Sequence, residues 1–354
     1  MKAQVFYEPE KMQLEEVDIP KVADDQVLVK VKTCGICGSD VAYYYGDTSL
    51  ETENGKGPLI LGHEFSGEVV EIGAIPEKLG LFELGDRVTV DPVQYCNACK
   101  ICKKGYVNLC ENKSVLGVSQ NGAFAEYCVS NYTGLHKIPD NVTYDQAAMT
   151  EPLACATYGV NNMSIQLGDF VVVIGAGVIG TMMVQLARSK GAGKIVFVGT
   201  RDYRLEIGKE SGADYIFNVR DEDSPYYTND LKAEIEKLTD GMFADAVITP
   251  TAAVSAMEQA FDITGRRSRI VFFGMPADIA VVRIPAAASI MWDKTVRFSW
   301  LAPFTWPTAL NAIASGLVDV EKLHTHTIAL EDLSQGIADV KARKDNVMKM
   351  LVKP

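Results

Sequence analysis

The sequence predicts an α/β protein that combines an irregular antiparallel β domain with a doubly wound parallel sheet. Short apolar runs broken by Gly, Pro and Asp fill about the first 150 residues and are typical of antiparallel strands. After about residue 165, apolar runs alternate with helical stretches, which is typical of a parallel sheet covered by helices. At that point the chain carries the motif GAGVIG, whose glycine spacing is typical of a strand-to-helix turn.

The individual elements follow from these patterns in chain order. In the first part we expect strands at Gln26–Gly35, at 65–73 and at 85–92. In the second part, Phe170–Ile174 is uniformly apolar and predicts a buried strand, and the next helix keeps one apolar face. Further on, we expect strands at 194–199, 244–250 and 268–275, helices at 230–241 and 253–264, and a closing helix and strand at 330–343 and 348–353.

Composition and charge exclude several classes of protein. The 354 residues suffice for two domains, and the net charge is 34 − 46 = −12. An acidic chain argues against nucleic acid or a membrane surface as the main partner. The first residues contain no apolar signal segment, and the uncharged stretch at 170–187 is interrupted by three glycines. We therefore expect neither secretion nor a membrane span, and a cytoplasmic protein.

The glycine motif predicts a dinucleotide site. Gly175 allows the tight turn, Gly177 lets the backbone approach a pyrophosphate, and Gly180 permits close packing of the helix on the strand. Val178 and Ile179 lie between these glycines at the expected start of the helix. Because the motif follows an apolar strand and opens an amphipathic helix, we interpret it as a cofactor site rather than a structural turn.

The next strand indicates which cofactor is bound. It ends in Gly199, where an acidic residue usually bonds the ribose 2′-hydroxyl, and Thr200, Arg201 and Arg204 follow. The missing carboxylate and the two guanidinium groups favour a 2′-phosphate, and therefore NADP(H) over NAD(H). The alternative is that both arginines are solvated surface charges and the cofactor is NAD(H).

Four of the eight cysteines predict a structural zinc site. Their spacing is C-x2-C-x2-C-x7-C, and four thiolates so close together complete a tetrahedral zinc with no open position. A zinc ribbon that binds nucleic acid is the alternative, because lysines lie nearby, but the acidic chain argues against it. The four residues are Cys96, Cys99, Cys102 and Cys110.

A second, dispersed set predicts a catalytic zinc. Cys37, His63 and a carboxylate would supply S, N and O ligands and leave one position open. His324 and His326 lie on one face of an extended segment without a third ligand nearby, and a metal role for them is the weaker hypothesis. We interpret the remaining candidates as structural: His136 as a loop residue, and Cys34, Cys128 and Cys155 as small buried apolar residues.

These motifs, together with LGHEFSGEVVEIG, GDRVTV, GAFAEY and EPLACATYG, closely resemble the zinc-dependent medium-chain dehydrogenase/reductase family, in particular its polyol dehydrogenase branch. The resemblance covers essentially the whole chain. It implies a discontinuous GroES-like catalytic domain at 1–157 and 295–354, and a Rossmann coenzyme domain at 158–294. It also implies an active site in the cleft between the domains and an oligomer, a homodimer or homotetramer.

The resemblance implies roles for individual residues. Cys37 and His63 match zinc ligands, while Glu64 and Glu151 match positions that bind zinc directly or through water, and both remain candidates. Ser39 matches the hydroxyl that relays the substrate proton, and Asp40 matches an acid that steadies the ligands. The reaction implied is hydride transfer between NADP(H) and a zinc-bound secondary alcohol or ketone.

One departure bears on the substrate. Polyol enzymes generally carry an Arg-Tyr pair in the late loop, where this chain has Leu301 and Ala302 beside Trp300. Such a site would leave sugar hydroxyls unpaired, so a less polar secondary alcohol or ketone competes with a polyol or ketose as substrate. We expect Tyr43, Trp300 and Leu301 to line the pocket. The alternative is that the loop aromatics Trp300, Phe304 and Trp306 are core or dimer-interface packing. The remaining alternatives are an NAD-dependent polyol dehydrogenase, of the sorbitol or threonine type, and a non-catalytic dinucleotide-binding protein.

Overall fold

The computed structural model describes residues 1–354 and divides them into two compact units. Unit 1 contains Met1–Pro152, Trp306–Ala314 and Leu323–Pro354, and unit 2 contains Leu153–Thr305 and Ser315–Lys322. This division differs from the domain limits expected from sequence. Residues 295–305 belong with unit 2, because the strand Thr295–Phe298 adds to its sheet.

Unit 1 is built from antiparallel strands, as its broken apolar runs predict. One sheet has the order β2-β1-β4, and a seven-stranded sheet has the order β10-β6-β5-β3-β18-β17 with β9 paired to β3. Only β17 and β18 pair in parallel within these two sheets, and β7 pairs with β8 in a separate ribbon. The strands are β1 (Lys2–Glu8), β2 (Lys11–Glu16), β3 (Gln26–Gly35), β4 (Leu59–Ile60), β5 (Glu64–Ile72), β6 (Arg87–Val90), β7 (Val93–Gln94), β8 (Ser114–Val115), β9 (Tyr127–Asn131), β10 (Leu135–Lys137), β17 (His324–Ala329) and β18 (Lys349–Lys353).

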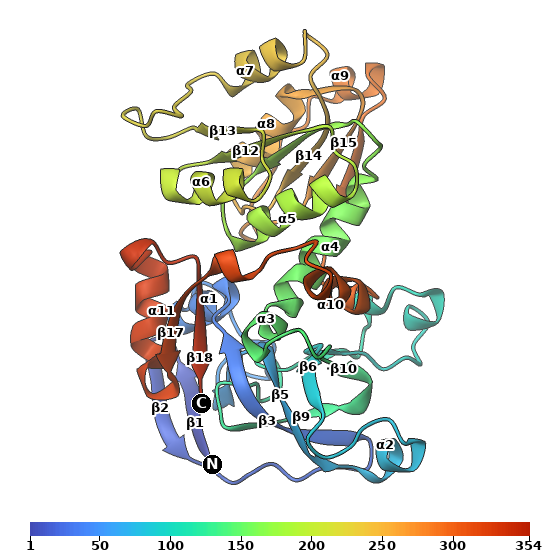
Figure 1. Ribbon diagram of the computed structural model, residues 1–354, viewed down its shortest axis with the longest axis vertical. Coiled ribbons are helices and arrows are strands. Elements are labelled where there is room, and N and C mark those ends of the chain that lie inside the picture. The colour runs from blue at the N-terminus through green and yellow to red at the C-terminus, as the bar shows by residue number, and fades with distance from the viewer. The chain divides into compact units, whose positions relative to one another are not determined.

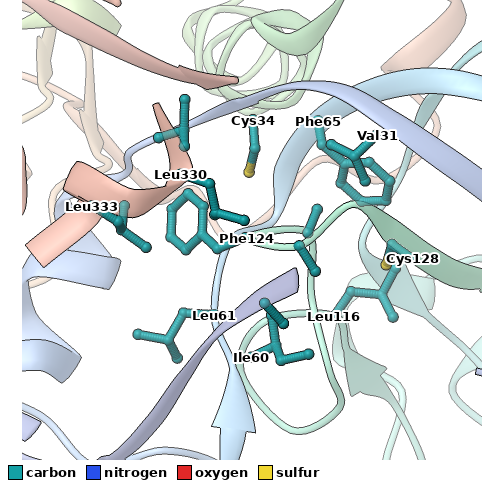
Figure 2. Packing of buried hydrophobic residues seen from close by; sticks show 14 of the residues in the cluster. Val31, Cys34, Ile60, Leu61, Phe65, Leu116, Phe124, Cys128, Leu330 and Leu333 are labelled. Atoms are coloured by element: carbon teal, nitrogen blue, oxygen red, sulfur yellow. The ribbon is translucent and has the colours of Figure 1, made fainter. Parts of the chain in front are cut away.

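The core of unit 1 lies between these sheets and the C-terminal helix. Phe65, Phe124 and Leu61 are fully buried there, and Leu330 reaches the same cluster from near the C-terminus (Figure 2). Cys34 and Cys128 are buried in this cluster, as expected from the sequence. The prediction for Cys155 is wrong in part, because its side chain is only partly buried on the helix Thr150–Met163.

Unit 2 contains the predicted doubly wound sheet. Its six strands are all parallel and have the order β13-β12-β11-β14-β15-β16. Successive strands are added on one side of β11 up to β13 and on the other side from β14, so the strand order reverses between β11 and β14. Helices α5 and α6 lie on one face of the sheet and α7 and α8 on the other (Figure 1). The strands are β11 (Phe170–Ile174), β12 (Lys194–Gly199), β13 (Tyr215–Asn218), β14 (Ala244–Thr249), β15 (Thr264–Phe272) and β16 (Thr295–Phe298).

The helices occur where the sequence changes from apolar runs to amphipathic patterns. In unit 1 they are α1 (Gly38–Tyr45), α2 (Ala74–Leu79), α3 (Tyr144–Ala148), α10 (Trp306–Ala314) and α11 (Leu333–Ala342). In unit 2 they are α5 (Val178–Ser189), α6 (Asp202–Glu210), α7 (Leu231–Leu238), α8 (Val254–Asp262) and α9 (Ala286–Met291), and α4 (Thr150–Met163) contains the boundary between the units. No helix is both long and apolar enough to cross a membrane.

Most predicted elements of the second unit are confirmed. The uniformly apolar stretch Phe170–Ile174 is β11 and is buried along its whole length. On α5, Met182, Met183 and Leu186 are buried against the sheet, as the apolar face predicts. One assignment in unit 1 is wrong: His136 lies in strand β10, not in a loop, and its ring stacks on Trp306 at 5.4 Å.

Candidate active site and metal centres

The four-cysteine cluster is built by local backbone alone. Cys96, Cys99, Cys102 and Cys110 bring their sulfur atoms within 4.8 Å of one another, inside a loop with only short 3-10 turns. Backbone N–H groups point at these sulfurs: Cys99 N donates to Cys96 Sγ at 3.3 Å, and Cys102 N donates to Cys99 Sγ at 3.4 Å. Such donors stabilise thiolates, and the backbone N–H groups of Ala98 and Cys99 lower the pKa of Cys96 to about 6.

The spacing of these sulfurs fits a tetrahedral zinc. Sulfur atoms bound to one zinc at about 2.3 Å lie about 3.8 Å apart. The Sγ atoms of Cys96 and Cys110 are 3.5 Å apart. The donor set is four sulfurs, and a closed thiolate set of this kind is typical of a structural rather than a catalytic zinc.

The dispersed set comes together from separate elements. Cys37 is the N-cap of α1, two residues after the end of β3, while Glu64 begins β5 and His63 directly precedes it. One ligand atom from each of Cys37, His63 and Glu64 lies within 4.8 Å of the others. His63 and Glu64 are buried, and Cys37 is partly exposed. A thiolate, an imidazole and a carboxylate therefore meet at one point and fit a zinc with an open position.

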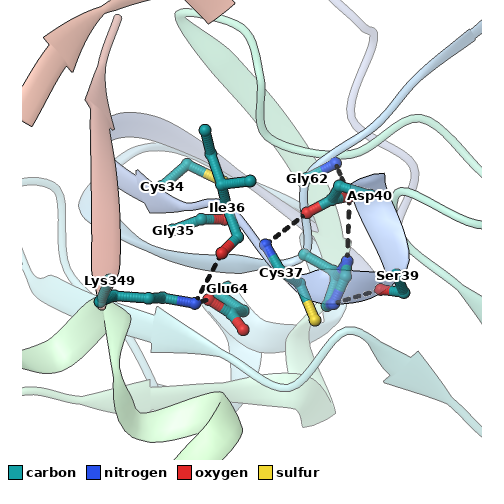
Figure 3. Close-up of polar contacts among 10 residues, drawn as sticks. Cys34, Gly35, Ile36, Cys37, Ser39, Asp40, Gly62, Glu64 and Lys349 are labelled. Atoms are coloured by element: carbon teal, nitrogen blue, oxygen red, sulfur yellow. Dashed lines mark hydrogen bonds and ion pairs between the residues drawn. The ribbon is translucent and has the colours of Figure 1, made fainter. Parts of the chain in front are cut away.

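Asp40 lies beside the Cys37, His63 and Glu64 group and contacts its backbone and its imidazole ring. Its fully buried carboxylate accepts a hydrogen bond from Cys37 N at 2.8 Å and from Gly62 N at 3.3 Å (Figure 3). It also lies 3.6 Å from His63 Nδ1, which leaves Nε2 of that ring for a ligand, and Ser39 Oγ lies 3.5 Å from Nε2. Burial by itself lowers the pKa of His63, but the negative Asp40 and Cys37 outweigh it and raise the pKa well above its usual value. The negative groups around His63 therefore favour a positive charge at this imidazole.

Lys349 is a residue of this site that sequence reasoning missed. It lies in β18, is almost completely buried, and donates from Nζ to Ile36 O at 3.0 Å while pairing with Glu64 Oε2 (Figure 3). A side chain on Gly35 would overlap the same carboxylate oxygen, at 2.4 Å. The one signal available in the sequence was a lysine inside the apolar run MKMLV, which predicts a paired, buried cation.

Glu151 is not part of the three-residue group. It lies at the start of α4 and interacts electrostatically with Lys349 and with Asp91. Asp91 is a second residue that the sequence did not reveal: it is buried, and it accepts hydrogen bonds from Val93 N at 2.9 Å and Tyr95 OH at 3.3 Å. Burial, with a smaller contribution from the negative Glu151, raises the pKa of Asp91 to about 7.

The glycine motif has the geometry that a pyrophosphate site needs. Gly175 has φ +139°, which side chains rarely adopt, and a Cβ on Gly180 would lie 2.0 Å from Gly175 O. A Cβ on Gly177 would meet nothing within 4 Å, so the space in front of the α5 N-terminus is open. Val178 and Ile179 form the first turn of α5. This open N-terminus can accept a phosphate through its N–H groups.

The end of β12 has no room for an acidic side chain. A Cβ on Gly199 would lie 2.5 Å from the Cβ of Ala176 in the glycine motif. Thr200 follows, Arg201 is the N-cap of α6, and Arg204 Nε donates to Tyr203 OH at 2.6 Å. Both arginines are partly exposed at the carboxyl end of the sheet. The basic residues expected from the sequence therefore lie directly after the end of β12.

The expected substrate residues belong to different units. Tyr43 lies on α1 in unit 1, and burial is the main reason that its pKa rises to about 12. Trp300 and Leu301 belong to unit 2, where Trp300 is exposed and Leu301 has φ +57°. Trp306, by contrast, is a packing residue: its side chain is only 3% exposed and its ring stacks on His136.

His324 and His326 lie at alternate positions of β17, but neither belongs to a candidate metal group. Each ring instead contacts a threonine hydroxyl: His324 contacts Thr327, and His326 contacts Thr325, both at 2.8 Å.

Comparison with known proteins agrees with this geometry. Residues 23–140 match the family described as alcohol dehydrogenase GroES-like domain, and residues 178–315 match zinc-binding dehydrogenase. D-arabitol-phosphate dehydrogenase from Enterococcus avium is 31% identical over 97% of this chain and 94% of its own.

Two solved structures with TM-scores of 0.90 each cover 100% of this chain and 99% of their own. One, 28% identical, is a zinc-binding dehydrogenase from Sinorhizobium meliloti 1021 bound to NADP. The other, 30% identical, is an alcohol dehydrogenase from Escherichia coli CFT073 complexed with NADH. The chain therefore belongs to the zinc-dependent medium-chain dehydrogenase/reductase family, in its polyol dehydrogenase branch, and is an alcohol dehydrogenase of that family.

Proposed function

We propose that this enzyme transfers a hydride between NADP(H) and a secondary alcohol or ketone. The observation that carries the choice of cofactor is the end of β12. Gly199 leaves no space for the carboxylate that would bond a ribose 2′-hydroxyl, and Arg201 begins the helix that follows. Guanidinium groups at this place suit a 2′-phosphate.

Within this proposal, Cys37, His63 and Glu64 hold the catalytic zinc. When bound, zinc supplies a Lewis acid for the substrate oxygen, and the nicotinamide exchanges the hydride. Glu64 is favoured over Glu151 as the direct ligand, because its carboxylate lies in the group with Cys37 and His63. Asp40 keeps the His63 ring in place through Nδ1, and Ser39, 3.5 Å from Nε2, relays the proton of the substrate hydroxyl toward solvent, releasing its own proton as it accepts that one.

The four-cysteine loop holds the second, structural zinc in this proposal. Its four sulfurs leave no position for a substrate. Metal analysis should therefore find about two zincs per chain. A content of one zinc per chain would instead favour the alternative of a non-catalytic dinucleotide-binding protein.

An initial-rate comparison on zinc-replete protein tests the choice of cofactor. The wild type should show a higher kcat/KM with NADP than with NAD. The double variant Gly199→Asp/Ala176→Gly, in which the smaller neighbour makes room for the carboxylate, should lower the NADP-to-NAD ratio about 10- to 100-fold. The new carboxylate repels the 2′-phosphate of NADP and can bond the ribose 2′-hydroxyl of NAD. A matched control is Arg266→Gln, an exposed arginine near the amino end of β15. A wild type that prefers NAD would contradict the proposal in favour of the NAD-dependent polyol dehydrogenase.

The substrate remains a choice between a polyol or ketose and a less polar secondary alcohol. The relative from Enterococcus avium supports the polyol, whereas Trp300 and Leu301 in the late loop support the apolar substrate. Turnover measured on a panel of polyols and apolar secondary alcohols separates the two, because an apolar pocket leaves extra hydroxyls without partners.

We also propose that the enzyme is a homodimer or homotetramer in the cytoplasm. Support for the oligomer comes from unit 2, where large apolar side chains are exposed along residues 275–298 next to the edge strand β16. Phe298 on that strand is 73% exposed. Light scattering should give at least twice the chain mass for the wild type, and Phe298→Glu should shift it toward the monomer. Support for the cytoplasm is that zinc-binding thiolates require a reducing compartment.

A further inference from the structure

The loop after β13 lies beside the end of β12. These strands pair in parallel, with Gly199 opposite Asn218, and Val219 N donates to Gly199 O at 3.0 Å. The residue after Val219 is Arg220, whose side chain is exposed. The sheet register therefore brings a third arginine, distant from Arg201 in sequence, to the same corner of unit 2.

Asn218 connects this loop to the N-terminus of α6. Its side chain is fully buried and uses both ends of its amide. Nδ2 donates to Asp202 Oδ1 at 2.7 Å, and Oδ1 accepts from Arg220 N and from Asp221 N, each at 3.0 Å. Ser224 Oγ donates to the same Asp202 oxygen at 2.7 Å. Two hydrogen bonds thus hold the Asp202 carboxylate within the protein, and the backbone of Arg220 is anchored beside it.

We propose that Arg220 is a third cationic residue for the 2′-phosphate of NADP(H), and that Asn218 is the positioning residue that holds it there. This inference rests on the proposed function, because it assumes that the end of β12 faces the adenosine ribose. It adds two residues that neither the glycine motif nor the arginines of α6 indicate.

The charges around Arg220 bear on how large its contribution is. The next three residues are Asp221, Glu222 and Asp223, all exposed, and Arg220 forms no ion pair with them or with any other described residue. Asp221 Oδ1 instead accepts from Asp223 N at 3.2 Å. Without Arg220 the loop would present only negative charge toward a phosphate, so removal of this arginine should weaken phosphate binding more than loss of one exposed contact.

Binding of two nucleotide fragments tests the proposal without the hydride transfer. By calorimetry, 2′,5′-ADP carries the diagnostic phosphate and 5′-AMP lacks it. Arg220→Gln should raise the Kd of 2′,5′-ADP about three- to tenfold and leave that of 5′-AMP within about twofold. Arg266→Gln, the same change of charge near the amino end of β15, should leave both unchanged.

A double-mutant cycle tests the role of Asn218. Asn218→Ala should weaken 2′,5′-ADP about as much as Arg220→Gln, and the double variant should be no weaker than either, because Asn218 acts through Arg220. Should Asn218→Ala fail to fold, as judged by circular dichroism, Arg220→Gln alone decides whether Arg220 contacts the phosphate.

The outcomes distinguish the two proposals. An unchanged Kd of 2′,5′-ADP in Arg220→Gln, together with a raised Kd in Arg201→Gln, overturns the role of Arg220 and leaves the NADP proposal standing. A wild type that binds 2′,5′-ADP no more tightly than 5′-AMP overturns both.

Discussion

The two candidate zinc centres of unit 1 are assembled in opposite ways. The four-cysteine cluster takes all its sulfurs from residues 96–110 and most of its hydrogen bonds from the same loop. The Cys37, His63 and Glu64 centre draws on β3, β5 and the N-terminus of α1, and it needs Lys349 from the C-terminal strand β18. One centre is a local structure, and the other depends on the tertiary fold.

This difference predicts how each centre responds to a substitution or to loss of its metal. A local thiolate loop can lose its metal and disorder by itself, because few contacts with the rest of the unit hold it. The dispersed centre contains buried charges of both signs, so a change there leaves an unpaired charge in the core.

Substitution of one ligand at each centre should show that one zinc serves catalysis and the other serves stability. Cys37→Ser should lower kcat/KM at least about 10³-fold, since a Lewis acid contributes several kcal/mol to the transition state, and zinc content should fall from about two to one. Cys99→Ser should also lose one zinc but retain most of the rate per folded molecule, with a lower Tm. Metal analysis and initial rates on both variants check this. Equal losses of kcat/KM in the two variants would contradict these separate roles of the two centres.

Removal of the buried lysine should destabilise unit 1. Lys349→Met leaves the buried Glu64 carboxylate without its cation and should cost about 3–5 kcal/mol of unfolding free energy. Lys353→Met is the matched control on the same strand, because its pair with Asp145 is partly exposed and should cost at most about 1 kcal/mol. Urea unfolding of the zinc-free proteins, in which no metal neutralises Glu64, measures both, and similar losses would show that the Glu64 pair contributes no more than a surface pair.

The buried Asp91, which accepts from Tyr95 OH just before the four-cysteine loop and interacts with the charge of Glu151, should make stability depend on pH. Its pKa in the folded protein is about 7, above the usual value of about 4 for Asp, so the folded state binds more protons across this window. Stability should therefore fall as pH rises from about 4 to 7, by about 3 kcal/mol in total. Asp91→Asn should remove this part of the slope while keeping the acceptor for Val93 N. A slope that persists in the variant would rule out Asp91 as its source.

The smallest effect is expected for a substitution of Asn112, which lies just after the four-cysteine loop. Asn112 is exposed, and its Nδ2 lies 3.9 Å from Cys96 Sγ. Because so long and exposed a contact contributes little, Asn112→Ala should change the rate of zinc release to a chelator by at most about threefold. A larger change would mean that the loop depends on its side chains and not mainly on backbone N–H donors.

Local patterns predicted most of the fold. The strand Phe170–Ile174, the glycine motif and the four-cysteine spacing each specify their structure within a few residues, and each occurs as expected. The domain limits differed because β16 is a short, mostly exposed strand without an apolar run, and no local pattern indicates which sheet such a strand joins. For the same reason His136 was assigned to a loop, since its short strand exists only through pairing with β6.

By itself the sequence determined the fold class, the phosphate loop, the four-thiolate cluster and the ligand residue types, because these depend on spacing along the chain. Only the tertiary structure decided that Glu64 joins Cys37 and His63, that Lys349 neutralises it, and that Val219, the neighbour of Arg220, bonds to Gly199. These contacts arise from strand register and from packing between residues up to 313 positions apart. Such partners follow from how the sheets pair and fill space, which spacing along one chain does not specify.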